Sequence, residues 1–274
     1  MTYIQRRLWH ETDQAGRQEL AENDILSRSE PLIVLGEPGM GKSQLLRKLA
    51  DVADLPSCTA RQLINRRDPQ SLLGDAPLIL IDALDEVAAK REGDAVDLVL
   101  QKLGILGYPR FILSCRVADW QAATSIAGIR EQYPDPPLQL HLEPLGRDDQ
   151  LAILQGRVGL HRAEKLLEHF EAYGLDFLGN PQTLDLIARL PDDRPLPASS
   201  GALFEQAIET LRVEHQPGKG THELARQAAL DAAGAAFAAL ILSGSAAIVR
   251  DGSANLVEGE LHMADVEALE SRND

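Results

Sequence analysis

The chain of 274 residues is long enough for one large domain or two small ones, and its 44% hydrophobic and 25% charged residues are an ordinary globular balance. A formal net charge of −15 argues against loose binding to nucleic-acid backbones, so the sequence carries no direct nucleic-acid signal. Cys58 and Cys115 stand in apolar surroundings, which predicts buried reduced thiols. The N-terminus has no apolar signal-peptide core, and we expect a cytoplasmic protein without a membrane span.

In chain order, residues 1–30 are polar and of mixed charge, and their weak helical pattern predicts a lead-in helix and linker. From Pro31 onward, apolar runs alternate with amphipathic stretches, which is the pattern of an α/β fold with a parallel sheet. We therefore assign 31–144 to an α/β core. The strands are predicted at 32–35, 57–60, 78–81, 111–115 and 138–142, and two of the helices at 42–53 and 94–106.

Beyond Pro144 the pattern becomes helical, which predicts a small all-helical domain over 145–215. Its helices are expected at 147–157, 161–173, 181–190 and 203–214. A further helix is expected from His222 in the last segment, 216–274. The uncharged, alanine-rich stretch 232–249 predicts a helix of small residues buried against a neighbour.

The sequence GEPGMGKS at 36–43 fits the phosphate-binding pattern G-x-x-x-x-G-K-[ST]. The backbone N–H groups of such a loop face the phosphates, the lysine reaches the β- and γ-phosphates, and the serine hydroxyl ligates Mg²⁺. The apolar run before it and the amphipathic stretch after it supply the strand–loop–helix context. The candidate nucleotide-binding residues here are Gly36, Glu37, Pro38, Gly39, Met40, Gly41, Lys42, Ser43 and Gln44.

Acidic and basic residues follow the third and fourth predicted strands. Asp82 would lie at the carboxyl edge of the sheet and hold Mg²⁺ together with Ser43. Asp85 or Glu86 could orient or deprotonate the attacking water; the alternative is an ordinary helix N-terminus, where acids are favoured. Arg116 would reach the γ-phosphate from the same edge; the alternative is a surface arginine that caps a strand end.

These segments together resemble the NACHT branch of the STAND ATPases, the signal-transduction relatives of the AAA+ proteins. The most specific match is DALDE at 82–86, with a small residue after the Mg²⁺ aspartate and then an acidic pair. The phosphate loop and the strand ending in Arg116 are also similar to the family's. LEPL at 142–145 matches its L-x-P-L step, and Gly179-Asn180-Pro181 resembles its G-x-P element, whose proline packs near the adenine.

The resemblance covers roughly residues 30–215 and implies a three-layer P-loop NTPase core, a helical lid domain and the start of a winged-helix domain after residue 216. It implies that Pro181 contacts the nucleotide. It further implies an Mg²⁺-dependent ATPase that is locked by ADP, activated by ATP and active in bacterial defence signalling. No N-K-x-D or T-K-x-D element is present, which favours ATP over GTP. We expect the chain to be a fragment of a larger protein or a minimal switch module. In either case it would self-assemble or bind separate sensor and effector proteins.

Two other functions remain open from the sequence. An AAA+-like loader or transposition regulator would turn over ATP continuously, although no trans-acting arginine and no substrate-gripping loop is visible in the sequence. A regulatory scaffold would bind nucleotide for stability and hardly hydrolyse it. The acidic pair Asp85-Glu86 argues against the scaffold.

Overall fold

The computed structural model describes residues 3–12, 16–84, 95–122, 126–174, 176–192, 194–199, 201–203, 205–206, 247–249 and 260–262. The chain divides into two compact units, 1–212 and 213–274. In the second unit, strand β8 (Ala247–Val249) pairs in parallel with β9 (Glu260–His262). The expected helix over 232–249 is therefore wrong for its last three residues. The helix from His222 and the winged-helix start lie outside the described residues.

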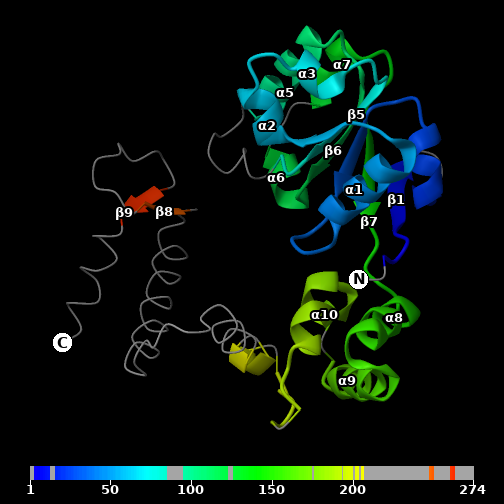
Figure 1. Cartoon of the computed structure of the whole chain (residues 1–274), viewed down its shortest axis with the longest axis vertical. Helices are drawn as coiled ribbons and strands as arrows, with labels where there is room; N and C mark the ends of the chain where they lie inside the picture. The colour runs from blue at the N-terminus through cyan, green and yellow to red at the C-terminus, as the bar shows by residue number, and fades with distance from the viewer. Residues whose placement is uncertain are drawn as a thin grey trace. The chain divides into compact units, whose positions relative to one another are not determined.

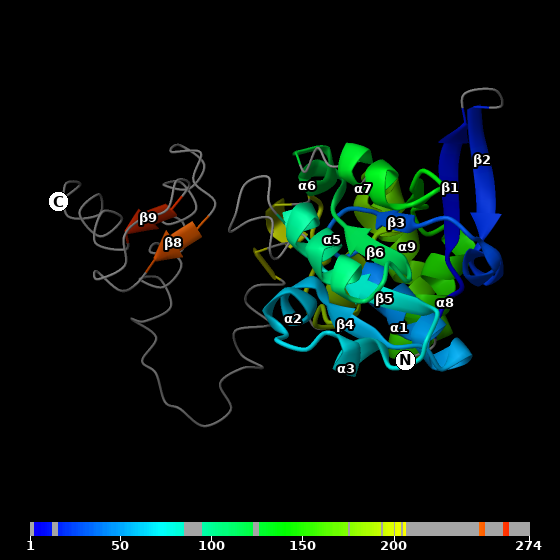
Figure 2. The same cartoon turned by 90° about the horizontal axis from the view of Figure 1, so that it is seen from above.

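The first unit is built around a seven-stranded sheet in the order β2-β1-β7-β3-β6-β5-β4 (Figures 1 and 2). Neighbours from β7 to β4 pair in parallel, and β1 pairs antiparallel with both β2 and β7. The parallel strands confirm the α/β core predicted from the apolar runs. The strands are β1 (Arg7–Thr12), β2 (Gly16–Ala21), β3 (Leu32–Leu35), β4 (Ser57–Thr59), β5 (Leu78–Asp82), β6 (Arg110–Cys115) and β7 (Leu138–Leu142).

Helices cover both faces of this sheet, which gives three layers. Ile33, Ile79 and Phe111 point to one face, where they join the buried side chains of α2, α3, α5, α6 and α7. Val34 and Leu80 point to the other face, toward α1 and the 3₁₀ helix η1. The helices are η1 (Glu22–Ser27), α1 (Lys42–Ala53), α2 (Ala60–Asn65), α3 (Gln70–Leu73), α5 (Ala95–Ile105), α6 (Val117–Ala122) and α7 (Ile126–Gln132).

The N-terminal segment forms a hairpin and a 3₁₀ helix, so the prediction of a lead-in helix in 1–30 was wrong. In β1, Leu8 is buried and its neighbours Arg7 and Trp9 are more exposed, which is the two-residue period of a strand. Leu8 pairs with Leu142 of β7, and the hairpin therefore extends the sheet by two antiparallel strands. Figure 2 shows the hairpin at the end of the sheet away from β4.

After β7 the chain forms a bundle of helices with its own hydrophobic cluster, which includes Leu154, Phe170 and Ile187. The elements are α8 (Arg147–Val158), α9 (Leu160–Ala172), the 3₁₀ helix η2 (Asp176–Gly179) and α10 (Pro181–Ala188). They lie close to three of the predicted helices, while most of the fourth, 203–214, lies outside the described residues. Cys58 and Cys115 are buried and free, as predicted. Within the described ranges, no helix is long and apolar enough to cross a membrane.

Candidate functional site

The phosphate-loop sequence connects the end of β3 to the start of α1. Gly39 and Gly41 have φ angles of +78° and +91°, which glycine adopts without strain. The Lys42 ammonium folds back over the loop and donates to the carbonyl oxygens of Gly36 at 2.7 Å and Glu37 at 3.2 Å. Helix α1 starts at Lys42 without a side-chain cap. Such a helix start presents backbone N–H groups and a positive dipole end to an anion.

The side chains of the loop residues differ in exposure. Met40 is buried in the core, whereas Glu37, Pro38 and Gln44 are exposed. Ser43 is partly buried beside Lys42. The loop thus anchors itself through Met40 and leaves its polar atoms accessible.

The carboxyl ends of β3, β6 and β5 lie at one edge of the sheet, as expected for parallel strands. Leu35 pairs with Cys115, so Arg116 follows at the level of Gly36. Its side chain is about half exposed, with Nε 3.9 Å from Asp119 Oδ2. Because β6 lies between β3 and β5, one strand separates the phosphate loop from Asp82.

A buried serine that the sequence analysis passed over holds Asp82 in place. Ser114 on β6 is fully buried, and its hydroxyl donates to Asp82 Oδ1 and accepts from the N–H of Ala83 at 3.0 Å. Ala83 has a φ of +58°, an unusual value for a residue with a side chain. The Leu84 N–H donates to the Ser114 carbonyl at 3.1 Å, so the chain turns across β6 directly after Asp82. The candidate catalytic pair that follows, Asp85 and Glu86, lies outside the described residues.

The Ser43 hydroxyl and the Asp82 carboxylate suit a magnesium ion. Both are oxygen donors, and Mg²⁺ in nucleotide sites is held by one or two such groups, phosphates and water. In the ranges that the structure covers, no group of three or more His, Cys, Asp and Glu side chains could hold a metal by itself.

The helical bundle contacts the phosphate loop through the start of α10. Asn180 caps α10 by accepting from the Gln182 N–H at 2.9 Å, and its Nδ2 donates to the Pro38 carbonyl at 2.8 Å. A Cβ on Gly39 would lie 2.7 Å from Gln182 Cβ, and the φ of Gly39 is +78°, so the position favours glycine. Pro181 lies near Gly41, with its Cγ 3.9 Å from the position of an added Cβ. The structure thus brings Pro181 to the phosphate loop.

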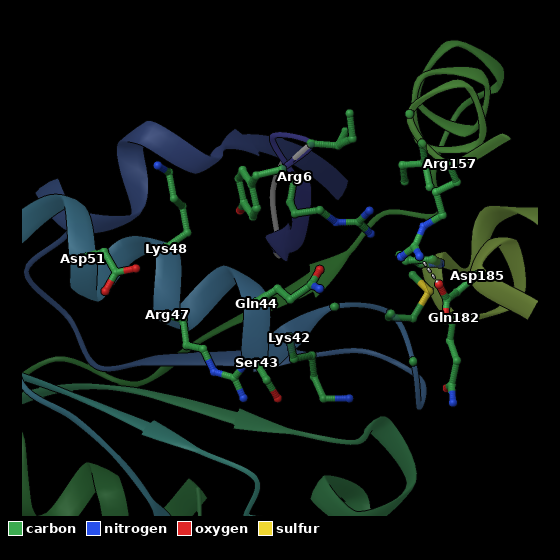
Figure 3. A pocket seen from close by; sticks show the side chains of 18 residues that line it. Arg6, Lys42, Ser43, Gln44, Arg47, Lys48, Asp51, Arg157, Gln182 and Asp185 are labelled. Atoms are coloured by element: carbon green, nitrogen blue, oxygen red, sulfur yellow. Dashed lines mark ion pairs between the residues drawn. The ribbon is translucent and has the colours of Figure 1, made fainter. Parts of the chain in front are cut away.

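A cavity of about 890 Å³ opens beside the loop (Figure 3). Its walls come from the N-terminal segment, α1, α8 and α10. Five cations and two acids line it, in a chain whose net charge is −15. The cavity therefore suits an anion of nucleotide size. The charged lining residues are Arg6, Lys42, Arg47, Lys48, Asp51, Arg157 and Asp185.

Two of these charges form an ion pair in the cavity wall. Arg157 on α8 contacts Asp185 on α10 (Figure 3). Asp185 also contacts Arg189 at 3.2 Å. The pair joins two helices of the bundle at the cavity. No sequence pattern indicated it, because the two residues lie far apart in the chain.

The N-terminal wall of the cavity is held by a buried carboxylate, Glu22. It accepts from the Tyr3 hydroxyl at 2.7 Å and from the Arg6 N–H at 2.6 Å. Burial and the nearby Glu22 carboxylate raise the pKa of Tyr3 well above its usual range. Burial lowers the pKa of Arg6, although Tyr3 and nearby carboxylates oppose that effect. Sequence reasoning missed all three residues, since nothing local marks them as parts of a site.

Comparisons with known proteins give a likeness of fold only. No protein-family model matches the chain, and no curated protein matches it either. Domain III of the Thermotoga maritima replication initiation protein DnaA is similar at 15% identity and a TM-score of 0.42, covering 71% of this chain and 88% of that one. The Thermotoga maritima RuvB Holliday junction branch migration motor is similar at 16% identity and a TM-score of 0.40, covering 72% and 66%.

A third solved structure, AMPPCP-bound DnaA from Aquifex aeolicus, is similar at 12% identity and a TM-score of 0.33, covering 72% of this chain and 86% of that one. With TM-scores below 0.5, these likenesses carry no argument about what this chain binds or does. The site's own residues show a P-loop α/β core, in which a glycine-rich loop, a basic cavity and the start of α10 meet.

Proposed function

We propose that this protein binds ATP and ADP and hydrolyses ATP slowly in an Mg²⁺-dependent reaction, as an AAA+-related switch of the NACHT type. The observation that carries the proposal is the strand–loop–helix segment of β3 and α1, with Lys42 over the loop and a basic cavity beside it. The resemblance of the 82–86 segment to NACHT proteins supports the finer assignment.

In this proposal the phosphates bind between the loop N–H groups and Lys42. Ser43 and Asp82 hold Mg²⁺, which offsets the negative charge of the phosphates when it is bound. Ser114 keeps the Asp82 carboxylate fixed at the sheet edge through its hydroxyl. Gln44 and Pro181 contact the nucleoside side, where the cavity opens between α1 and α10.

Hydrolysis is assigned to the acidic pair that follows Leu84 in the sequence and to Arg116, which follows β6 at the sheet edge. Asp85 or Glu86 orients or deprotonates the attacking water, and Arg116 stabilises charge on the γ-phosphate. Arg116 follows β6 at the level of Gly36, so its backbone lies next to the start of the phosphate loop.

The γ-phosphate gives the switch its two states. It is present only with ATP, so its contacts with Arg116 and Mg²⁺ favour the ATP state over the ADP state. The Asn180–Pro38 hydrogen bond links the phosphate loop to the helical bundle, which could carry the difference outward. Self-assembly, or the binding of separate sensor and effector proteins, would depend on which of the two states is present. The proposed role in bacterial defence signalling rests on the family resemblance alone.

The binding test compares the affinity for ADP and ATP of the wild type and of Lys42→Ala. Loss of a hydrogen-bonding charge at the phosphates should weaken binding roughly 10- to 150-fold. Lys165→Ala is the matched control, because Lys165 is an exposed lysine on α9, away from the cavity. Unchanged affinity in Lys42→Ala would contradict the proposed site.

The hydrolysis test uses Asp85→Ala, Glu86→Ala and the double variant. Each should keep its affinity for ATP and hydrolyse it more slowly, because only the activation of water is lost. Full turnover by the double variant would refute the catalytic assignment.

The alternative is an AAA+-like loader, and two of the similar solved structures are by their names a replication initiator and a branch migration motor. Steady turnover stimulated by DNA would favour a loader. A switch should change mass or shape between ADP and a non-hydrolysable ATP analogue. No change, together with negligible turnover, would favour the scaffold.

A further inference from the structure

The segment before β1 and the start of β1 touch three parts of the first unit. Ile4 packs against the hydrophobic cluster of the helical bundle, and Leu8 of β1 belongs to the cluster on one face of the sheet. Between them, Arg6 lines the cavity and is only 5% exposed. Glu22 holds the segment in this position through Tyr3 and the Arg6 N–H.

The Arg6 guanidinium is buried and has few hydrogen-bond acceptors around it. Its Nη2 donates to the Glu143 carbonyl at 2.8 Å, while its Nε is buried without a hydrogen-bond partner. In the described part of the chain, no carboxylate lies within ion-pair distance of it. A buried cation is costly unless acceptors surround it. The buried Nε is closed to a ligand, but Arg6 lines the cavity, so a ligand there can accept from the Nη nitrogens of the guanidinium.

The position of Arg6 indicates which part of a nucleotide it meets. In the view of Figure 3, Arg6 reaches into the cavity from above α1, whereas Lys42 and Ser43 extend below that helix. In the proposed function, the phosphates lie at Lys42 and Ser43. That leaves the part of the cavity lined by Arg6 and Gln44 for the nucleoside half.

The same guanidinium also holds the connection between the sheet and the helical bundle. Glu143 lies between the end of β7 and the start of α8, and its carbonyl accepts from Arg6. The Glu143 N–H donates to the Arg7 carbonyl at 2.9 Å, and its side chain pairs with Arg17 of β2. Arg6, Arg7 and Arg17 therefore hold the connection at residues 143–146, named the hinge from here on, from several sides.

We propose that Arg6 donates hydrogen bonds to the nucleoside half of the bound nucleotide and, through the Glu143 carbonyl, couples occupancy of the cavity to the hinge. The coupling rests on the proposed function, since it needs phosphates at Lys42. A ligand that holds the Arg6 guanidinium also holds the hydrogen bond to Glu143, and the hinge should become more rigid when the cavity is filled.

The first experiment measures binding of ADP and of inorganic tripolyphosphate, which has phosphates and no nucleoside. Arg6→Met should weaken ADP binding roughly 10- to 150-fold and leave tripolyphosphate binding unchanged. Lys42→Ala should weaken both. Arg7→Ala is the matched control, because the side chain of Arg7 is 59% exposed and pairs with Asp149 outside the cavity. It should weaken neither.

The two proposals fail in different ways. A wild type that binds neither ADP nor tripolyphosphate would overturn the proposed function. A wild type that binds ADP, with Arg6→Met binding it as tightly, would overturn only the role of Arg6. Equal loss of ADP and tripolyphosphate in Arg6→Met would also overturn it, because Arg6 would then act on the phosphates.

Folding is controlled by the choice of methionine, which keeps much of the side-chain volume and removes the buried charge. Replacement of a buried charge by an apolar side chain is often neutral or stabilising. We expect Arg6→Met to melt at or above the wild-type temperature while losing ADP affinity. If it melts lower, Arg6→Lys, which keeps the charge and loses the planar fork, should fold and still bind ADP more weakly. Wild-type affinity in Arg6→Lys would overturn the proposal.

The hinge is tested by amide hydrogen exchange at Glu143, Leu145 and Gly146, since Pro144 has no amide N–H. Saturating ADP should slow exchange there in the wild type. In Arg6→Met at ADP concentrations that saturate it, the slowing should be lost. Equal protection in Arg6→Met and the wild type would overturn the coupling.

Discussion

The contact between the helical bundle and the phosphate loop predicts that Asn180 has two separable roles. Its Oδ1 caps α10, and its Nδ2 donates to the Pro38 carbonyl at 2.8 Å. Replacement of such a cap by alanine costs about 1 kcal/mol. Loss of the exposed amide–carbonyl bond costs about 0.5–1 kcal/mol, the lower part of the usual range. Asn180→Ala should therefore lower the free energy of unfolding by about 1.5–2 kcal/mol.

Asn180→Ser separates the two roles, because serine caps a helix about as well as asparagine and has no amide to reach Pro38. It should lower the free energy of unfolding by only about 0.5–1 kcal/mol. The affinity for ADP should fall equally in both variants, by roughly two- to fivefold, because both leave the phosphate loop unattached to α10.

Urea unfolding and ADP titration of the two variants and the wild type measure these effects. If ADP affinity falls in Asn180→Ala and stays at the wild-type value in Asn180→Ser, affinity follows helix stability and the link between α10 and the loop is refuted.

Two further predictions concern buried side chains. Ser114→Ala leaves the Ala83 N–H without its acceptor and the Asp82 carboxylate without its donor. The free energy of unfolding should therefore fall by about 1–3 kcal/mol, and Mg²⁺-dependent ATP turnover should slow. Wild-type stability in urea together with wild-type turnover would contradict the role of Ser114. Burial raises the pKa of the Cys58 thiol from the usual 9.0 to about 11. At pH 8 the thiolate fraction of Cys58 should therefore be roughly 100-fold lower in the folded protein than in a thiol with the usual pKa. Alkylation of Cys58 should be slower by at least that factor than in urea, and equal rates would show that the thiol is accessible.

The sequence predicted the part of the fold that local patterns encode. Strands buried on both faces are continuous apolar runs, and 78–81 and 111–115 were found for that reason. The glycine, lysine and serine of the phosphate loop have a fixed spacing that needs no tertiary information. The sequence also predicted that Asp82, Arg116 and the phosphate loop lie at one edge of the sheet, because parallel strands place their carboxyl ends together.

The rest depends on contacts between distant segments. β1 was missed because its pairing with β7 joins residues far apart in the sequence, and six residues of mixed polarity carry a weak strand signal. Ser114 was included only as part of the strand predicted at 111–115, since its hydroxyl bonds to Asp82 at the end of β5 and to Ala83 just after it, far away in the sequence. Arg6 and Arg157 line the cavity only because the N-terminal segment and α8 meet there.

The pairing of β1 with β7 also has a consequence for the order of events during synthesis. Leu8 pairs with Leu142, so the hairpin leaves the ribosome long before its sheet partner exists. At ordinary rates of translation the interval is about 7 to 27 s. β3 also remains unpaired for a time, because both of its neighbours in the sheet, β6 and β7, are synthesised later. The growing chain therefore exposes unpaired strand edges until residue 142, and the phosphate loop gains its last contacts only when Asn180 and Gln182 have emerged.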